Sequence, residues 1–200
     1  MQMKITNLKK RNGDFSLDIE SFEITEAGIY GLVGRNGCGK TTLMKIIAGI
    51  IKPDEGSIDY NGLMPRDITM LLRRPYILRA SVMDNLLYPL KIRKIQPDMK
   101  QVEFFLEQAE LKRDQYAPSL SGGQQQKLAL IRGLIFSPKF MLIDEAFSNM
   151  DEESTEVFEA MIKAQKDSVF LICSHQSAQI NRLCDKTFEM RNGRMLSGIS

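Results

Sequence analysis

The sequence predicts an α/β fold with a mostly parallel sheet, and two observations carry that prediction. First, from residue 28 onward, apolar stretches of strand length alternate with segments of helical periodicity, apart from one helical stretch in the middle. Such alternation is typical of parallel strands joined by crossover helices. Second, 200 residues with 43% hydrophobic content suit one domain with a modest insertion. We therefore expect a single domain over residues 1–200.

The first 65 residues predict an antiparallel β subdomain. Apolar residues alternate with polar ones from Phe15 to Ile24, around an expected bend, and Asn12-Gly13 before them favours a hairpin turn. A short run, Gly28 to Val33, is apolar on both faces, as in a buried parallel strand. A glycine-rich loop follows, and a helix is expected from about Lys40 to Ala48.

The middle of the chain, about residues 75–120, predicts an inserted α-helical subdomain. Within it, Asp98 to Arg113 carries apolar residues at helical spacing with charges between them, which indicates an amphipathic helix. The alternation of strands and helices then returns. We expect strands at Phe140–Ile143 and Val169–Cys173, helices at about Glu153–Gln165 and Gln176–Leu183, and a final hairpin at Asn192-Gly193.

Composition excludes several classes of protein. The chain has 27 Lys and Arg against 25 Asp and Glu, a net charge of +2, which argues against binding nucleic acid through bulk positive charge. No apolar run approaches the roughly 18 to 20 residues of a membrane-spanning helix, and no secretory signal follows the first residues. Three cysteines without metal-ligand spacing suggest reduced thiols in a cytoplasmic protein.

A phosphate-binding loop is the clearest motif. Residues 34–41 match GxxxxGK[ST] between an expected strand and an expected helix. Lys40 is expected to reach the β- and γ-phosphates, and the Thr41 hydroxyl to ligate Mg²⁺. Cys38 is either an oxidisable thiol near a helix start or simply a small packing residue. The expected nucleotide-binding residues are Gly34, Asn36, Gly37, Cys38, Gly39, Lys40, Thr41 and Thr42.

Two acids end the strand that begins at Phe140. Asp144 is placed to hold Mg²⁺, and Glu145 to polarise an attacking water as general base. The alternative is that such a pair merely caps the next helix. Together with the phosphate loop, the pair favours hydrolysis of a nucleoside triphosphate.

A second glycine motif, Leu120-Ser121-Gly122-Gly123-Gln124, opens a helix 24 residues before Asp144. Its amides and hydroxyl suit a second anion site, which one nucleotide does not require. The pentapeptide resembles the signature motif of the ATP-binding-cassette ATPases, and the resemblance covers essentially the whole chain. It implies the P-loop nucleotide-hydrolase core of that family.

The resemblance implies a head-to-tail dimer, homomeric or heteromeric, with composite sites. The signature loop of one subunit, including Ser121, Gly122, Gly123 and Gln124, would close on ATP held by the other. Asp151 matches the acid of the loop through which the subunits communicate. His175 matches the switch histidine, which in the family touches the γ-phosphate and holds the attacking water. The expected catalytic set is therefore Lys40, Glu145 and His175.

Two positions depart from the family pattern. Arg73 stands where the family has a glutamine that ligates Mg²⁺, and a guanidinium cannot ligate a cation. Arg73 either contacts phosphate directly, so that Arg73→Ala lowers ATPase activity, or points to solvent while water completes the Mg²⁺ shell. The aromatic position that stacks on adenine is Asn12, with Phe15 three residues on, and Phe15 is also a candidate core residue.

The resemblance implies an ATPase subunit of a membrane transporter that binds ATP and Mg²⁺. Its expected partners are separate integral membrane permease subunits, and it is not expected to bind nucleic acid. It would lie in the cytoplasm, peripheral on the inner face of the cell membrane. The alternative is a soluble ATPase of an assembly complex, as in iron-sulfur cluster assembly. The related ATPases of DNA repair are disfavoured, because only 104 positions separate Lys40 from Asp144, too few for long coiled coils. An intact catalytic set also disfavours a nonhydrolysing dimerisation module.

Overall fold

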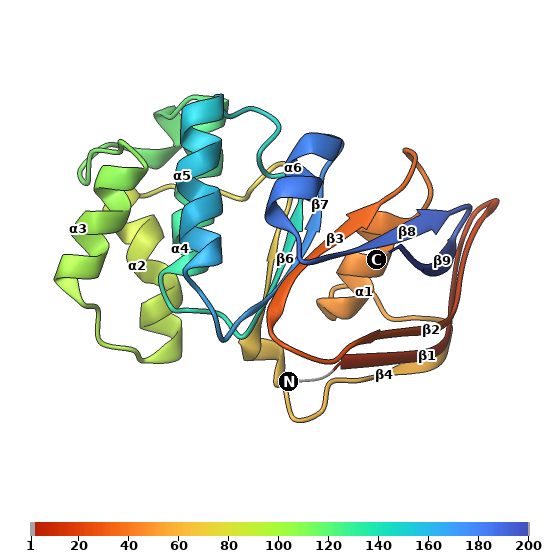
Figure 1. Ribbon diagram of the computed structural model, residues 1–200. Helices are drawn as coiled ribbons and strands as arrows, with labels where there is room; N and C mark the ends of the chain where they lie inside the picture. Colours follow the sequence, from red (N-terminus) through yellow and green to blue (C-terminus); the bar gives the residue numbers. More distant parts are fainter. Residues whose placement is uncertain (1–2, 200) are drawn as a thin grey trace. The chain divides into compact units, whose positions relative to one another are not determined.

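The computed structural model describes residues 3–199, and their strands form two sheets (Figure 1). The chain divides into two compact units. The first comprises the described residues up to 70, residues 139–144 and those from 166 onward, and the second comprises residues 71–138 and 145–165. The predicted phosphate loop lies in the first unit, and the predicted signature motif lies in the second.

The smaller sheet has the strand order β2-β1-β4 and is antiparallel, as predicted. Its strands are β1 (Met3–Asn12), β2 (Phe15–Ile24) and β4 (Glu55–Asp59). The chain turns from β1 to β2 after Asn12, which confirms the predicted hairpin.

At the position of the expected bend, β2 continues as one strand, but its pattern of buried residues shifts. The buried positions of β2 are Leu17 and Ile19, then Phe22 and Ile24, so the alternation shifts by one residue between the two pairs. The opposite strand β1 shifts at the same point, because its buried residues are Ile5 and then Leu8, and Asn7 between them adopts a left-handed φ of 48°. The register of β1 against β2 is the same on both sides of Asn7, whereas its register against β4 shifts between Thr6 and Lys9. Both halves of β2 thereby keep their apolar side chains on the core.

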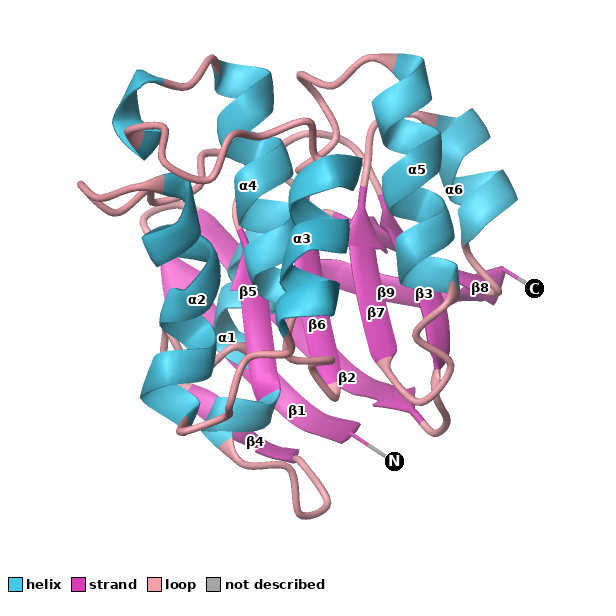
Figure 2. Cartoon of the chain, turned by 90° about the vertical axis from the view of Figure 1, so that its left-hand side faces the viewer, coloured by secondary structure: helices cyan, strands magenta, loops and turns pink. Residues whose placement is uncertain are grey.

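The larger sheet has the order β5-β6-β7-β3-β8-β9, and Figure 2 shows β5, β6 and β7 next to one another. Strands β6, β7, β3 and β8 run parallel, while β9 is antiparallel to β8. This mostly parallel sheet confirms the predicted fold class. The bounds are β3 (Gly28–Val33), β5 (Ile68–Leu71), β6 (Phe140–Asp144), β7 (Val169–Cys173), β8 (Lys186–Arg191) and β9 (Arg194–Ile199).

Two helices belong to the first unit, α1 (Lys40–Ile47) and α6 (Ser177–Leu183), together with a short 3₁₀ turn at Pro65–Asp67. The buried face of α1, which includes Leu43 and Ile47, joins buried residues of both sheets in one hydrophobic cluster. Because α1 directly follows the predicted phosphate loop, burial of this face fixes the helix start from which the loop is presented.

The second unit is helical, with α2 (Val82–Arg93), α3 (Met99–Gln108), α4 (Gly122–Leu134), α5 (Glu152–Lys163) and a 3₁₀ turn at Ala117–Ser119. Helix α3 lies within the amphipathic segment predicted over residues 98–113. Helix α4 packs against α2. A buried polar contact supports this packing, since the Arg132 Nη1 of α4 donates to Asn85 Oδ1 of α2 at 3.2 Å.

Within residues 3–199, no helix combines the length and apolar character needed to cross a membrane. Of the three cysteines, Cys38 and Cys173 are buried and Cys184 is half-buried.

Candidate active site

The phosphate loop connects β3 to α1, as its sequence predicts. Gly39 forms the N-cap of α1 with φ of 109°, a conformation that side chains disfavour. A Cβ on Gly39 would also lie 2.8 Å from Phe15 Cζ, so any other residue here would displace the Phe15 ring as well. The loop is tied down as well, because Gly193 N donates to Cys38 O at 3.0 Å. Cys38 is 5% exposed, which fits a small packing residue better than an oxidisable thiol.

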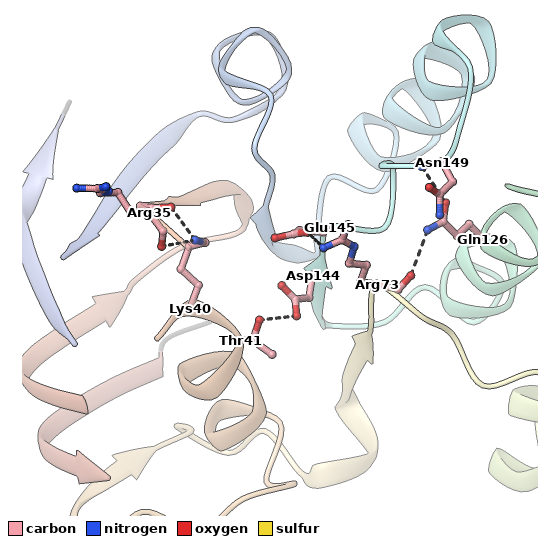
Figure 3. Close-up of polar contacts among 9 residues, drawn as sticks. Arg35, Lys40, Thr41, Arg73, Gln126, Asp144, Glu145 and Asn149 are labelled. Atoms are coloured by element: carbon pink, nitrogen blue, oxygen red, sulfur yellow. Dashed lines mark hydrogen bonds and ion pairs between the residues drawn. The ribbon is translucent and has the colours of Figure 1, made fainter. Parts of the chain in front are cut away.

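Lys40 points back into the loop that precedes it (Figure 3). Its Nζ donates to Gly34 O at 2.7 Å and to Arg35 O at 3.2 Å, although the residue is only 7% exposed. The ammonium group therefore lies on the concave side of the loop, where loop amides and a helix start favour an anion. This position suits a cation that binds the β- and γ-phosphates of a nucleotide.

Thr41 and Asp144 come together as the predicted metal ligands. Thr41 Oγ1 donates to Asp144 Oδ2 at 2.8 Å (Figure 3). The other carboxylate oxygen, Asp144 Oδ1, is buried and has no hydrogen-bond partner among residues 3–199. A buried carboxylate oxygen without a donor is costly, and a hard cation with oxygen ligands would satisfy it. The donor set therefore fits Mg²⁺.

The parallel strands bring the predicted residues of the first unit to one edge of the large sheet. Asp144 at the end of β6 pairs in register with Cys173 at the end of β7. His175 follows two residues later and is exposed. Strand β3, which leads into the phosphate loop, pairs with β7 on its other side. The loop, Asp144 and His175 thus emerge where ligands of parallel sheets bind.

In the second unit, Glu145 forms an ion pair that the sequence did not predict. Its Oε2 lies 3.1 Å from Arg73 Nη1 (Figure 3). The Glu145 side chain is 14% exposed and that of Arg73 is 65% exposed. Neither alternative considered for Arg73 included this contact. No sequence signal announces it, since the two residues lie 72 positions apart.

The signature residues open helix α4. Ser121 is the N-cap, and its Oγ accepts from Gln124 N at 3.3 Å while Gln124 Oε1 accepts from Ser121 N at 3.0 Å. This reciprocal cap fixes the first turn and leaves the amides of Gly122 and Gly123 at a helix N-terminus. A Cβ on Gly123 would lie 2.8 Å from Asn149 O, so the loop after Glu145 approaches α4 closely.

Asp151 has a local structural partner. It is the N-cap of α5, and its Oδ1 accepts from Ser154 N at 2.7 Å. That backbone N–H, as the largest influence, lowers the pKa of the Asp151 carboxyl from its ordinary value of 3.8. The residue that matches the family's communication loop is therefore held as a carboxylate at the start of a helix.

One further residue was missed by the sequence reasoning. Gln126 of α4 is 2% exposed, and its Nε2 donates to Arg73 O at 3.2 Å while its Oε1 accepts from Asn149 N at 3.3 Å. A single side chain thus joins the segment after β5 to the loop after Glu145 (Figure 3). The sequence signal was the glutamine-rich helix start, in which Gln126 is the second residue after the signature motif.

The two candidates for the adenine position have distinct surroundings. Phe15 is half-buried and packs against the hydrophobic cluster beside Gly39, whereas Asn12 is exposed at the end of β1. Phe15 therefore has a core role next to the phosphate loop.

These features define an ATPase of the ATP-binding-cassette class. They are a mostly parallel sheet with the phosphate loop, the Thr41–Asp144 pair, and a capped signature helix in a helical unit. A family model described as ABC transporter matches residues 17–148, and the chain belongs to that family. It is an ATP-binding subunit that couples ATP hydrolysis to transport.

Several relatives that the chain resembles in sequence are named as uptake or import proteins. The chain is 37% identical to the tungstate uptake system ATP-binding protein TupC of Peptoclostridium acidaminophilum, over 98% of this chain and 97% of that protein. It is 31% identical to a probable sulfate/thiosulfate import ATP-binding protein CysA of Chlorella vulgaris, over 98% of this chain and 90% of that protein. It is 29% identical to the methionine import ATP-binding protein MetN of Legionella pneumophila, over 97% of this chain but only 63% of that protein.

A solved structure of an ATP-binding subunit of an ABC transporter shares the fold. Its TM-score is 0.90 at 20% identity, over all of this chain and 90% of that one. The relatives named above are transport subunits, which favours transport over the assembly-complex alternative.

Proposed function

We propose that the chain works as one half of a head-to-tail dimer that hydrolyses ATP at composite sites and drives separate membrane permease subunits in import. The observation that carries the catalytic part is the phosphate loop, with the Lys40 ammonium held 2.7 Å from Gly34 O and Thr41 2.8 Å from Asp144. Import is supported by the printed names of the three relatives, which are uptake or import proteins.

In this proposal Lys40 exchanges its loop carbonyls for phosphate oxygens when ATP binds. The exchange replaces two neutral acceptors with charged ones, which strengthens the hydrogen bonds. Thr41 and Asp144 hold Mg²⁺, which supplies charge neutralisation on the β- and γ-phosphates. The amides of the phosphate loop, from Gly34 to Thr42, orient the phosphate chain.

Glu145 accepts a proton from the attacking water, and His175 holds that water and the γ-phosphate in place. Ser121 and the amides of the next glycines supply donors to the γ-phosphate of the ATP bound by the other subunit. Asp151 lies in the loop that communicates between subunits. Each site is complete only when two subunits meet, so hydrolysis is coupled to dimerisation.

We further propose a tetrahedral oxyanion of the tungstate or sulfate class as the cargo. Two relatives that this chain spans by 90% or more carry tungstate or sulfate/thiosulfate in their names, whereas it spans only 63% of the methionine relative. The cargo binds to partner subunits, and this chain lies on the cytoplasmic face of the membrane against the permease. Accumulation of tungstate and sulfate in cells carrying the chain or its Glu145→Gln variant tests this part.

The dimer is tested with Glu145→Gln. We expect this variant to bind ATP and Mg²⁺ without turnover, and to elute from gel filtration as an ATP-dependent dimer. Lys40→Met is the matched control, because it removes the phosphate contact and should elute as a monomer. A Glu145→Gln protein that stays monomeric at saturating ATP and Mg²⁺ argues against composite sites. Copurification of permease subunits from native membranes separates transport from soluble assembly.

A further inference from the structure

The ion pair between Arg73 and Glu145 is asymmetric in its exposure. The guanidinium, on a side chain that is 65% exposed, reaches in from solvent to within 3.1 Å of a carboxylate oxygen on a side chain that is only 14% exposed. The shielded partner is the expected general base. Arginine is the side chain best suited to bind a carboxylate, since its planar fork stays charged at all relevant pH values.

Both ends of this ion pair are held by the backbone around them. Glu145 directly follows β6 and adopts a left-handed φ of 53°, which is uncommon for a residue with a side chain. At the other end, Arg73 O accepts a hydrogen bond from Gln126. The same Gln126 side chain holds Asn149 N in the loop after Glu145. The backbone on both sides of the ion pair is therefore held in place, while the exposed Arg73 side chain keeps its own rotational freedom.

The Arg73 guanidinium, 3.1 Å from Glu145 Oε2, occupies the space next to that oxygen and restrains the orientation of the carboxylate. We propose that Arg73 is a positioning residue that restrains Glu145 in the single subunit, both before and after ATP binds, and that this contact opens before the carboxylate acts. The proposal rests on the proposed role of Glu145 as general base. It assigns Arg73 a function that a neutral glutamine at the same position would not have.

The exposure of Arg73 makes such opening easy. The guanidinium can swing into solvent by side-chain rotation alone, while the Gln126 contact to the Arg73 carbonyl stays intact. Partly exposed ion pairs contribute little to stability, so the closed contact should slow turnover by about two- to five-fold and no more. Arg73 thus lowers the rate of ATP hydrolysis by the subunit but does not abolish it.

The test compares three substitutions in the chain of residues 1–200. Arg73→Met removes the charge without adding an oxygen ligand, Arg73→Lys keeps the charge, and Arg74→Met removes an equal charge from the exposed neighbouring residue. We expect Arg73→Met to raise kcat for ATP by about two- to five-fold at unchanged KM. Arg73→Lys should give a smaller increase, and Arg74→Met should match the wild type. A lower kcat in Arg73→Met would overturn the proposal in favour of direct phosphate contact.

A second measurement needs no activity. Thermal unfolding of the nucleotide-free wild type, Arg73→Met, Glu145→Gln and the double variant forms a cycle that isolates the pair. We expect a coupling of about 1–4 °C in Tm. If the Tm changes of the two single variants simply add in the double variant, Arg73 and Glu145 do not interact in the nucleotide-free protein, and the proposal is overturned. If coupling is present but Glu145→Gln still hydrolyses ATP, the assigned general base fails while the contact stands, so the two failures are distinguishable.

Discussion

Replacing Gln126 by methionine removes both hydrogen bonds of its amide while keeping an unbranched side chain of similar length. The residue is 2% exposed, and its two partners are backbone groups of Arg73 and Asn149 at 3.2 and 3.3 Å. Each such bond contributes about 1 kcal/mol net. We therefore expect Gln126→Met to lower the free energy of unfolding by about 2 kcal/mol and Tm by about 4–8 °C.

The assay is thermal unfolding of the nucleotide-free protein, followed by circular dichroism. The matched control is Gln125→Met, on the next residue of α4. Gln125 is half-buried and makes one such bond, from its Nε2 to Leu120 O at 3.0 Å, so its substitution should lower Tm by about half as much. Equal Tm values for the Gln126→Met protein and the wild type would refute the conclusion that Gln126 holds the two loops together.

Three further substitutions test the site. Lys40→Met keeps the alkyl stem but removes the ammonium, and we expect ATP affinity measured by calorimetry to fall by at least about 10-fold; unchanged affinity would contradict the placement of Lys40. Thr41→Val removes one proposed Mg²⁺ ligand, so half-maximal ATPase activity at fixed ATP should need more Mg²⁺, and an unshifted Mg²⁺ titration would exclude Thr41 as a ligand. Asp151→Ala removes the carboxylate whose pKa is lowered by Ser154 N. Because the folded-state pKa is lowered, the stabilisation is present above the ordinary value and lost as pH falls through the lowered pKa. The Tm difference from the wild type should be largest near neutral pH and shrink in acid, and a pH-independent difference would show that the carboxylate charge contributes nothing.

Elements governed by local pattern could be predicted from the sequence. The alternation from Phe15 to Ile24 gave β2, and the apolar stretch Val169–Cys173 gave β7 with the same bounds. The phosphate loop was predictable for the same reason, because its glycines, Lys40 and Thr41 act within eight consecutive residues. Local rules suffice where the partners are close in the chain.

Helix α2 shows where local reasoning fell short. The helix lies in the insertion predicted as α-helical over about residues 75–120, but its own bounds were not predicted, and Pro89 lies inside it although proline usually breaks a helix. The start signal was nevertheless present, since Ser81 and Asp84 form a capping box. Tertiary burial of Leu86 and Leu90 against the rest of the second unit outweighs the cost of the proline.

The contacts of Arg73 could not be predicted for a different reason. Its partners, Glu145 and Gln126, lie 72 and 53 positions away along the chain. Such contacts depend on how distant segments pack. A departure from a family pattern can therefore be noticed in the sequence, but its chemical consequence requires coordinates.

The position of β3 in the large sheet has a consequence for synthesis of the protein. This strand carries the phosphate loop near the start of the chain, yet its hydrogen-bonded neighbours β7 and β8 are made near the other end. Gly193, which donates to Cys38 O, is made later still. A nascent chain that has not emerged from the ribosome as far as residue 193 therefore lacks the framework of its loop. Assembly of the nucleotide-binding loop is therefore expected to be a late event in synthesis of the protein.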